Sequence, residues 1–157
     1  MRRLAPVLIV LLMFVACGGD TPDEADPVDP QRVAAQDRAS QSDLNFALAV
    51  AHVYFSDDDD YAGFDSGCTA EANSCAFGEE TEPVLDWRSE ASQGEDIVAV
   101  TLASPEEVVI TTISQSGEEF CTGDKASGGG GTVRGKGPGA ASVDTYAACE
   151  ALGPEAW

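Results

Sequence analysis

Positively charged residues are scarce in this chain. Its 157 residues include 28 Asp and Glu but only 8 Lys and Arg, which gives a formal net charge of −20 at pH 7. A surface that binds DNA or RNA must neutralise phosphates with Lys and Arg, and adhesion to anionic lipid through charge needs a basic patch. The composition therefore argues against nucleic acid as a partner. Apolar residues still make up 43% of the chain, which is enough for one small core.

Long apolar runs and catalytic motifs are also missing. The apolar run Leu4–Ala16 has thirteen residues, whereas a membrane-spanning helix needs about 20. The single histidine, His52, has no G-x-S-x-G motif to accompany it, so we interpret it as structural rather than as part of a Ser-His-Asp triad. The glycines at 128–131 lack the Gly-Lys-Ser/Thr that ends a phosphate-binding loop. We therefore expect no catalytic residues and no enzyme activity.

The first residues are typical of an exported lipoprotein. Two arginines, Arg2 and Arg3, precede the apolar run, as in a secretory signal peptide. Ala16 then precedes Cys17, which resembles the bacterial lipobox, in which the cysteine is acylated, for example with palmitate. We predict a signal peptide over residues 1–16 and a lipid on Cys17 that anchors the mature chain to the membrane. The alternative is an ordinary signal peptide with an unmodified cysteine.

The anchor is followed by an acidic, proline-rich segment. Residues 18–30 contain three Pro and five Asp or Glu, so this stretch has too few apolar side chains to fold. Mutual repulsion and proline stiffness favour an extended stalk. We therefore divide the chain into a signal peptide (1–16), an acylated cysteine with its stalk (17–30) and one globular domain (31–157). The domain is expected outside the cytoplasm, on the plasma membrane's outer face or on the outer membrane of a two-membrane bacterium.

Four cysteines remain once Cys17 carries lipid. An even number in an exported chain indicates two disulfides, for which three connectivities are open. We favour a short local pair and a long C-terminal pair. The intervening six, 45 and 27 residues do not suit a zinc site, which usually has close C-x₂₋₄-C pairs. The expected pairs are Cys68–Cys75 and Cys121–Cys149.

A long helix is predicted from residue 31 to about residue 55, where there is no Gly or Pro. Five apolar residues recur at three- and four-residue steps along one face: Leu44, Ala47, Leu48, Ala51 and Phe55. Further apolar residues widen that face, so we expect burial over much of the second half: Phe46, Val50, Val53 and Tyr54. The polar first half is expected to be exposed.

The rest of the domain is predicted to form a small antiparallel sheet. Residues 97–102 and 108–113 are β-branched runs between turn signals, and 118–122 is a third strand candidate. The glycine-rich stretch 127–141 is predicted to be a mobile loop, and 143–152 a short helix or strand that Cys149 attaches to the fold. This order of elements predicts an α+β fold, with one long N-terminal helix on the sheet and a disulfide-closed C-terminal region.

Residues 34–65, AAQDRASQSDLNFALAVAHVYFSDDDDYAGFD, resemble the helix and following loop of type IV pilin-like proteins. EPVLDW (82–87) and SGEEFC (116–121) are similar to later elements of that family. The resemblance implies a pilin fold, with a long helix against about four antiparallel strands. Pilins also carry a hydrophobic N-terminal half-helix, in place of which this sequence has a lipobox and a stalk. The resemblance thus implies a non-enzymatic lipoprotein that serves as an accessory component of pilus or type II secretion-like machinery and binds a protein partner.

The alternative function is a free-standing, lipid-anchored ligand-binding or adhesin domain stabilised by calcium. The acidic run at 57–60 does not match an EF-hand, but Asp57, Asp59 and Asp65 together offer the oxygen ligands that Ca²⁺ prefers. No other cofactor is expected. The nearby aromatic residues Tyr61 and Phe64 are interpreted as core residues, with contact to a partner as the alternative.

The intact mass of the protein purified from its host tests the lipid and the disulfides together. We expect the chain to begin at Cys17 with acyl groups attached, because the lipobox cysteine is the acylated residue. Reduction should then add the hydrogens of two disulfides. A mass that corresponds to an unmodified Cys17 would contradict the anchor.

Overall fold

The computed structural model describes residues 29–138 and 143–154. The predicted signal peptide, Cys17 and most of the stalk lie outside the described residues. Within the described part of the chain, no helix combines the length and the apolar character that crossing a bilayer requires.

The long helix α1 spans Pro30–Asp58. Asp29 caps its start by accepting a hydrogen bond from the Gln31 N–H, and Pro30 fits the first turn because its missing N–H has no partner there. The helix ends where Asp59 adopts a left-handed conformation with φ 60°, which Asp tolerates better than most residues. The prediction of a helix near 31–55 is confirmed, with three further residues at the C-terminal end.

Five strands form one sheet in the order β1-β2-β3-β4-β5. Their bounds are Asp86–Arg88, Ile97–Ala103, Glu107–Ile113, Glu118–Lys125 and Val133–Pro138. Strands β2 to β5 form the expected antiparallel meander. The short strand β1 pairs in parallel with β2, so the prediction of a purely antiparallel sheet was wrong. The segment 89–96 causes this difference. It brings the chain back to the end of the sheet at which β1 begins, so β2 starts beside the start of β1 instead of closing a hairpin with it.

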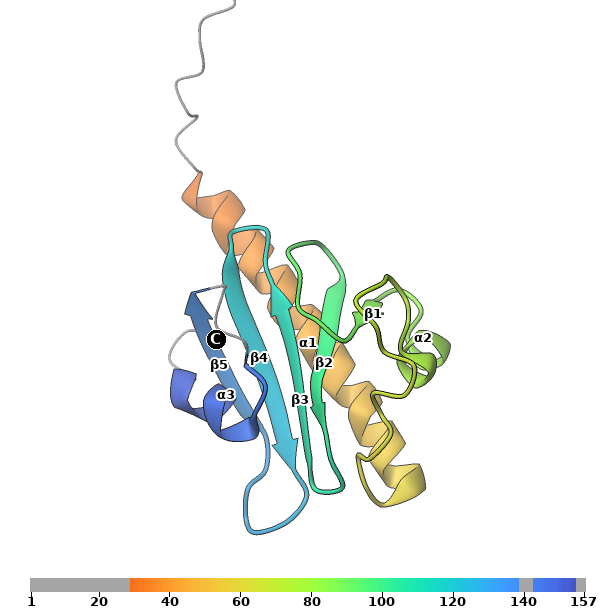
Figure 1. Ribbon diagram of the computed structural model, residues 1–157. Coiled ribbons are helices and arrows are strands. Elements are labelled where there is room, and N and C mark those ends of the chain that lie inside the picture. The colour runs from red at the N-terminus through yellow and green to blue at the C-terminus, as the bar shows by residue number, and fades with distance from the viewer. Residues whose placement is uncertain (1–28, 139–142, 155–157) are drawn as a thin grey trace, which may run out of the picture.

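Helices cover both faces of this sheet. In Figure 1, α1 crosses behind the strands, and the short helix α3 (Tyr146–Leu152) lies in front of them over β4 and β5. A third helix, α2 (Ala76–Thr81), lies near β1. The larger core, between α1 and the sheet, is built around Leu44, Ala51, Tyr61, Phe64, Trp87, Val108, Ile110 and Phe120. The smaller core under α3 contains Val109, Cys121, Val143, Tyr146 and Cys149.

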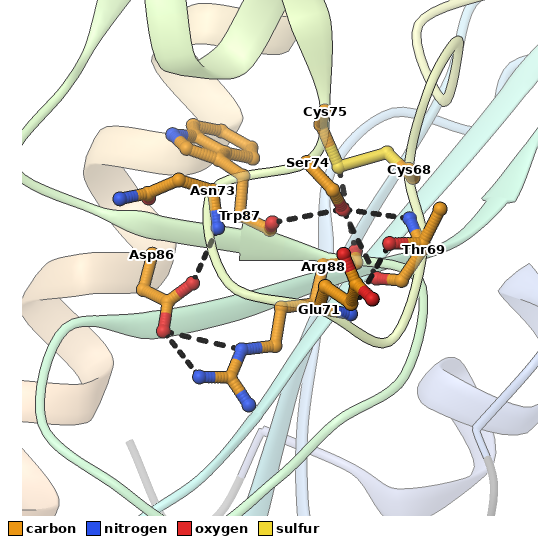
Figure 2. Close-up of a disulfide and its surroundings, with 9 residues drawn as sticks. All are labelled: Cys68, Thr69, Glu71, Asn73, Ser74, Cys75, Asp86, Trp87 and Arg88. Atoms are coloured by element: carbon orange, nitrogen blue, oxygen red, sulfur yellow. Dashed lines mark hydrogen bonds and ion pairs between the residues drawn. A yellow bond between two sulfur atoms is a disulfide. The ribbon is translucent and has the colours of Figure 1, made fainter.

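Both expected disulfides are present, Cys68–Cys75 and Cys121–Cys149. The second one joins α3 to β4. Figure 2 shows the first one beside β1, where Ser74 accepts a hydrogen bond from the Thr69 N–H at 2.6 Å and the Asn73 N–H donates to Asp86 at 2.8 Å. Two disulfides are typical of proteins that fold in an oxidising compartment outside the cytoplasm.

The prediction of a mobile loop over 127–141 was wrong in part, because residues 133–138 form strand β5. Gly135 and Gly137 lie on the strand face that α3 covers. A Cβ atom at Gly135 would lie 2.5 Å from the Cys149 carbonyl oxygen and 2.7 Å from Leu152 Cβ. These glycines therefore allow α3 to approach the strand closely. The glycine content that predicted a loop instead serves the packing of α3 on β5. Residues 139–142 lie outside the described residues.

The polar first half of α1 is partly buried, so the prediction that it is exposed was wrong in part. Asp37 and Ser40 are both buried. Asp37 accepts hydrogen bonds from Ser114 (2.9 Å), Ser116 (2.6 Å) and Lys136 (3.0 Å), which belong to the β3–β4 turn and to β5. Burial opposes ionisation of this carboxyl, but these three hydrogen bonds outweigh it and hold its pKa below the usual value. The hydrogen bonds of Asp37 thus hold this half of the helix against the sheet.

Replacing Gly135 with Ala should destabilise the domain by about 2–3 kcal/mol, because overpacking forces shifts of atoms that cannot easily move. The Cys149 carbonyl is backbone and is held in place by its disulfide. Gly137→Ala is the matched control, since its new Cβ would meet only the flexible Leu152 side chain at 3.0 Å. Thermal unfolding followed by circular dichroism measures both variants. Equal losses of stability would contradict the close packing of α3 at Gly135.

Candidate functional site

An open groove lies between α1 and the segment that precedes β1. Phe46 on α1 is 57% exposed, and Val84, just before β1, is 72% exposed. Both line the same groove of about 310 Å³. Only one other large apolar side chain in the described part of the chain, Val53, is similarly exposed. Contiguous exposed apolar groups of this kind are characteristic of binding surfaces.

Carboxylates surround the apolar side chains. We call this surface the acidic groove and define it by the residues that line it: Asp43, Phe46, Glu82, Val84, Leu85 and Asp96. A smaller hollow of about 190 Å³ adjoins it, shares Asp43 and Asp96 with it, and adds Glu95. The described lining of the two hollows includes no Lys, Arg or His. The groove therefore combines apolar surface with negative charge.

The helix exposes Phe46 because the sheet covers only one side of α1. Leu44, Ala47 and Ala51 face the sheet and are fully buried, whereas Phe46 and Val53 lie away from it. The expectation that Phe46 and Val53 would widen the buried face was therefore wrong, because no second layer packs on that side in the described structure. Val50, in contrast, is buried as expected.

Asp43 is the electrostatically unusual residue of the groove. Its carboxyl accepts a hydrogen bond from the Asp96 backbone N–H, which favours the charged form. Burial and the negative charges of Asp96 and Glu95 act more strongly in the opposite direction and raise the pKa of Asp43 to about 6. The groove thus loses one negative charge when the pH falls below about 6.

A second polar group surrounds Asp124 on β4. Tyr61 donates a hydrogen bond to this carboxylate at 2.6 Å, Thr132 donates to it at 3.0 Å, and His52 Nε2 lies 3.5 Å away. Burial and contact with Asp124 raise the pKa of Tyr61. These contacts join α1 and the following loop to the sheet. The structural role of His52, whose side chain is 48% exposed, stays a prediction. Tyr61 and Phe64 are core residues, as expected.

The predicted calcium ligands lie at the end of α1 and in the loop after it. Asp57 is in the last turn, Asp59 caps the helix, and Asp65 follows in an exposed turn. Across the described ranges, no group of three or more His, Cys, Asp or Glu is arranged to hold a metal ion. The calcium site remains a prediction. The lipidation site, Cys17, lies outside the described residues.

We found no match to this chain among protein-family models, curated proteins or solved structures. The function must therefore be inferred from the groove, the disulfides and the sequence itself.

Sequence reasoning missed the acidic groove, although part of the signal was available. Phe46 lies outside the three- and four-residue steps of the buried helix face, which is a sign of exposure. Val84 follows Pro83 in EPVLDW, which the sequence links only to the pilin-like resemblance. Nothing in the sequence shows that Phe46 and Val84, far apart along the chain, line one groove.

Replacing Asp43 with Asn should stabilise the domain at pH 8 by about 1 kcal/mol, a value reduced for solvent screening. The pKa of Asp43 is higher in the folded protein than its usual value of 3.8. The folded state therefore loses stability as the pH rises from about 4 through 6, and Asn removes that loss. At pH 4 the variant and the parent should differ little.

Urea unfolding at both pH values measures this effect. Asp57→Asn is the matched control, because it removes the same charge from an exposed position on the same helix. A stabilisation that is independent of pH, or equal in the two variants, would contradict the claim that the charged form of Asp43 is destabilised in the folded protein.

Proposed function

We propose that this protein is an exported, lipid-anchored binding protein that uses the acidic groove to hold a protein partner. The acidic groove carries the proposal, because two exposed large apolar side chains, Phe46 and Val84, line one open depression. Exposed apolar side chains that line one depression suit an interface. The two disulfides support a role outside the cytoplasm.

Binding accounts for the groove better than catalysis does. Its described lining offers carboxylates and apolar side chains, with no histidine, lysine or cysteine beside the carboxylates to form a nucleophile–base pair. His52 lies on another part of α1, where its Nε2 is 3.5 Å from Asp124 of β4. All four cysteines of the described ranges are in disulfides. We therefore propose a non-enzymatic role.

The partner class that we propose is a component of pilus or type II secretion-like machinery. The resemblance of residues 34–65 to type IV pilin-like proteins supports this assignment, as does the arrangement of one long helix over an antiparallel meander. The polar first half of α1 is engaged with the sheet through Asp37. This helix therefore suits an accessory protein, held by lipid on Cys17, better than a subunit of the filament core.

A photo-crosslinking amino acid placed at Phe46 in the full chain, in its own cells, should give a covalent adduct with an envelope protein. Glu71 is the control position, because it is exposed and is not among the residues that line the groove. Mass spectrometry of the adduct identifies the partner. A filament or secretion component supports the proposed class, while an unrelated surface ligand favours the free-standing adhesin. Absence of an adduct specific to position 46 would contradict binding through the groove.

A further inference from the structure

We propose that the occupant of the acidic groove is a cationic peptide segment, in which an apolar side chain seats against Phe46 and Val84 while flanking Lys or Arg residues pair with the surrounding carboxylates. This inference rests on the proposed binding function and specifies the chemistry of the partner.

Charge complementarity identifies the occupant. Three carboxylates, those of Asp43, Glu82 and Asp96, line the groove, and Glu95 lines the adjoining hollow. No described Lys or Arg lines either hollow. Four of the described basic side chains have partners elsewhere: Arg88 with Asp86, Lys125 with Glu107, Lys136 with Asp37 and Arg134 with Asn45. A partner that brings its own cations would therefore meet a surface of matching sign.

The same charges disfavour the other occupants. A second copy of this chain carries a formal net charge of −20 and would place carboxylates against carboxylates. The acidic residues of 18–28 in the chain's own stalk have the same sign. Anionic lipid headgroups would also be repelled. An uncharged apolar partner could cover Phe46 and Val84, but it would leave buried carboxylates without a counter-charge.

The apolar side chains add selectivity to this electrostatic attraction. A surface with so many acids attracts any polycation weakly, and salt screens that attraction. Phe46 and Val84 offer apolar area that only a peptide with its own apolar side chain can bury. The groove should therefore distinguish a cationic peptide with apolar residues from one of equal charge without them.

Asp43 should make the interaction dependent on pH. The groups that face it are Asp96 and Glu95 from the 89–96 segment, and Glu82 lines the same groove from the segment after α2. Because the pKa of Asp43 is about 6, the groove holds one negative charge fewer at pH 5 than at pH 7.5. A lysine-rich peptide keeps its charge over this range, so any weakening of binding would come from the protein.

Fluorescence polarisation of labelled synthetic peptides with the full mature protein tests the proposal. The probes are a lysine–leucine peptide, a lysine–glycine peptide of equal charge and a glutamate–leucine peptide. We expect the lysine–leucine peptide to bind at least about tenfold more tightly than either of the others, because it alone satisfies both the charge and the apolar requirement. Equal binding of the two lysine peptides would overturn the proposal.

Matched variants locate the binding. Phe46→Ser should weaken lysine–leucine binding about tenfold or more, whereas Val53→Ser, which changes an exposed apolar residue outside the groove, should change it little. Asp43→Asn with Asp96→Asn should weaken binding by about five- to tenfold, against little effect of Asp144→Asn with Glu150→Gln, which removes two exposed charges on the other side of the sheet. Equal effects of groove and control variants would mean that only the overall charge matters, which overturns the proposal.

Two further readouts complete the test. Binding should be about two- to threefold weaker at pH 5 than at pH 7.5, and Asp43→Asn should abolish that difference. Circular dichroism confirms that each variant is folded. If crosslinking at Phe46 captures a partner but the lysine–leucine peptide does not bind at the groove, the proposed function stands and the cationic chemistry is wrong. If neither occurs, both fail.

Discussion

The packing of α1 across one face of the sheet is the interaction on which the rest of the structure depends. On the helix side of this contact, Leu44, Ala47 and Ala51 are fully buried, and the contact forms the larger core. Hydrogen bonds from Ser114 and Lys136 to Asp37 fix the first half of the helix to the sheet, and His52 in the second half lies 3.5 Å from Asp124. Because one sheet can cover only one side of a helix, the opposite side of α1 remains open, and the exposure of Phe46 follows directly.

The other face of the sheet solves a different problem. A helix of only seven residues, α3, buries too little surface to stay in place by itself. The Cys121–Cys149 disulfide holds it, and glycines at 135 and 137 bring the strand beneath it close enough to pack. The charged residues of β5 point the opposite way, where Lys136 reaches Asp37 and Arg134 reaches Asn45. One strand therefore serves two layers through its alternation.

The acidic groove arises where the open side of α1 meets the segments around β1. The parallel pairing of β1 with β2 turns the 89–96 segment back toward the helix, so Glu95 and Asp96 come near Asp43. Burial and like charge then raise the pKa of Asp43, while Phe46 and Val84 supply exposed apolar surface. A cationic peptide would relieve the repulsion and cover the apolar surface at once, which links the stability of this site to its proposed occupant.

The sequence by itself determined the elements that depend on local patterns. Apolar spacing predicted α1, β-branched runs predicted β2 and β3, and the even number of cysteines predicted two disulfides, whose pairing the structure confirms. Only the tertiary structure decided the mixed sheet, the strand at Val133–Pro138 and the groove. Each of these joins segments distant in sequence: β1 with β2, Gly135 with Cys149, and Asp43 with Asp96. Periodicity describes one segment at a time, whereas a site forms where separate segments meet.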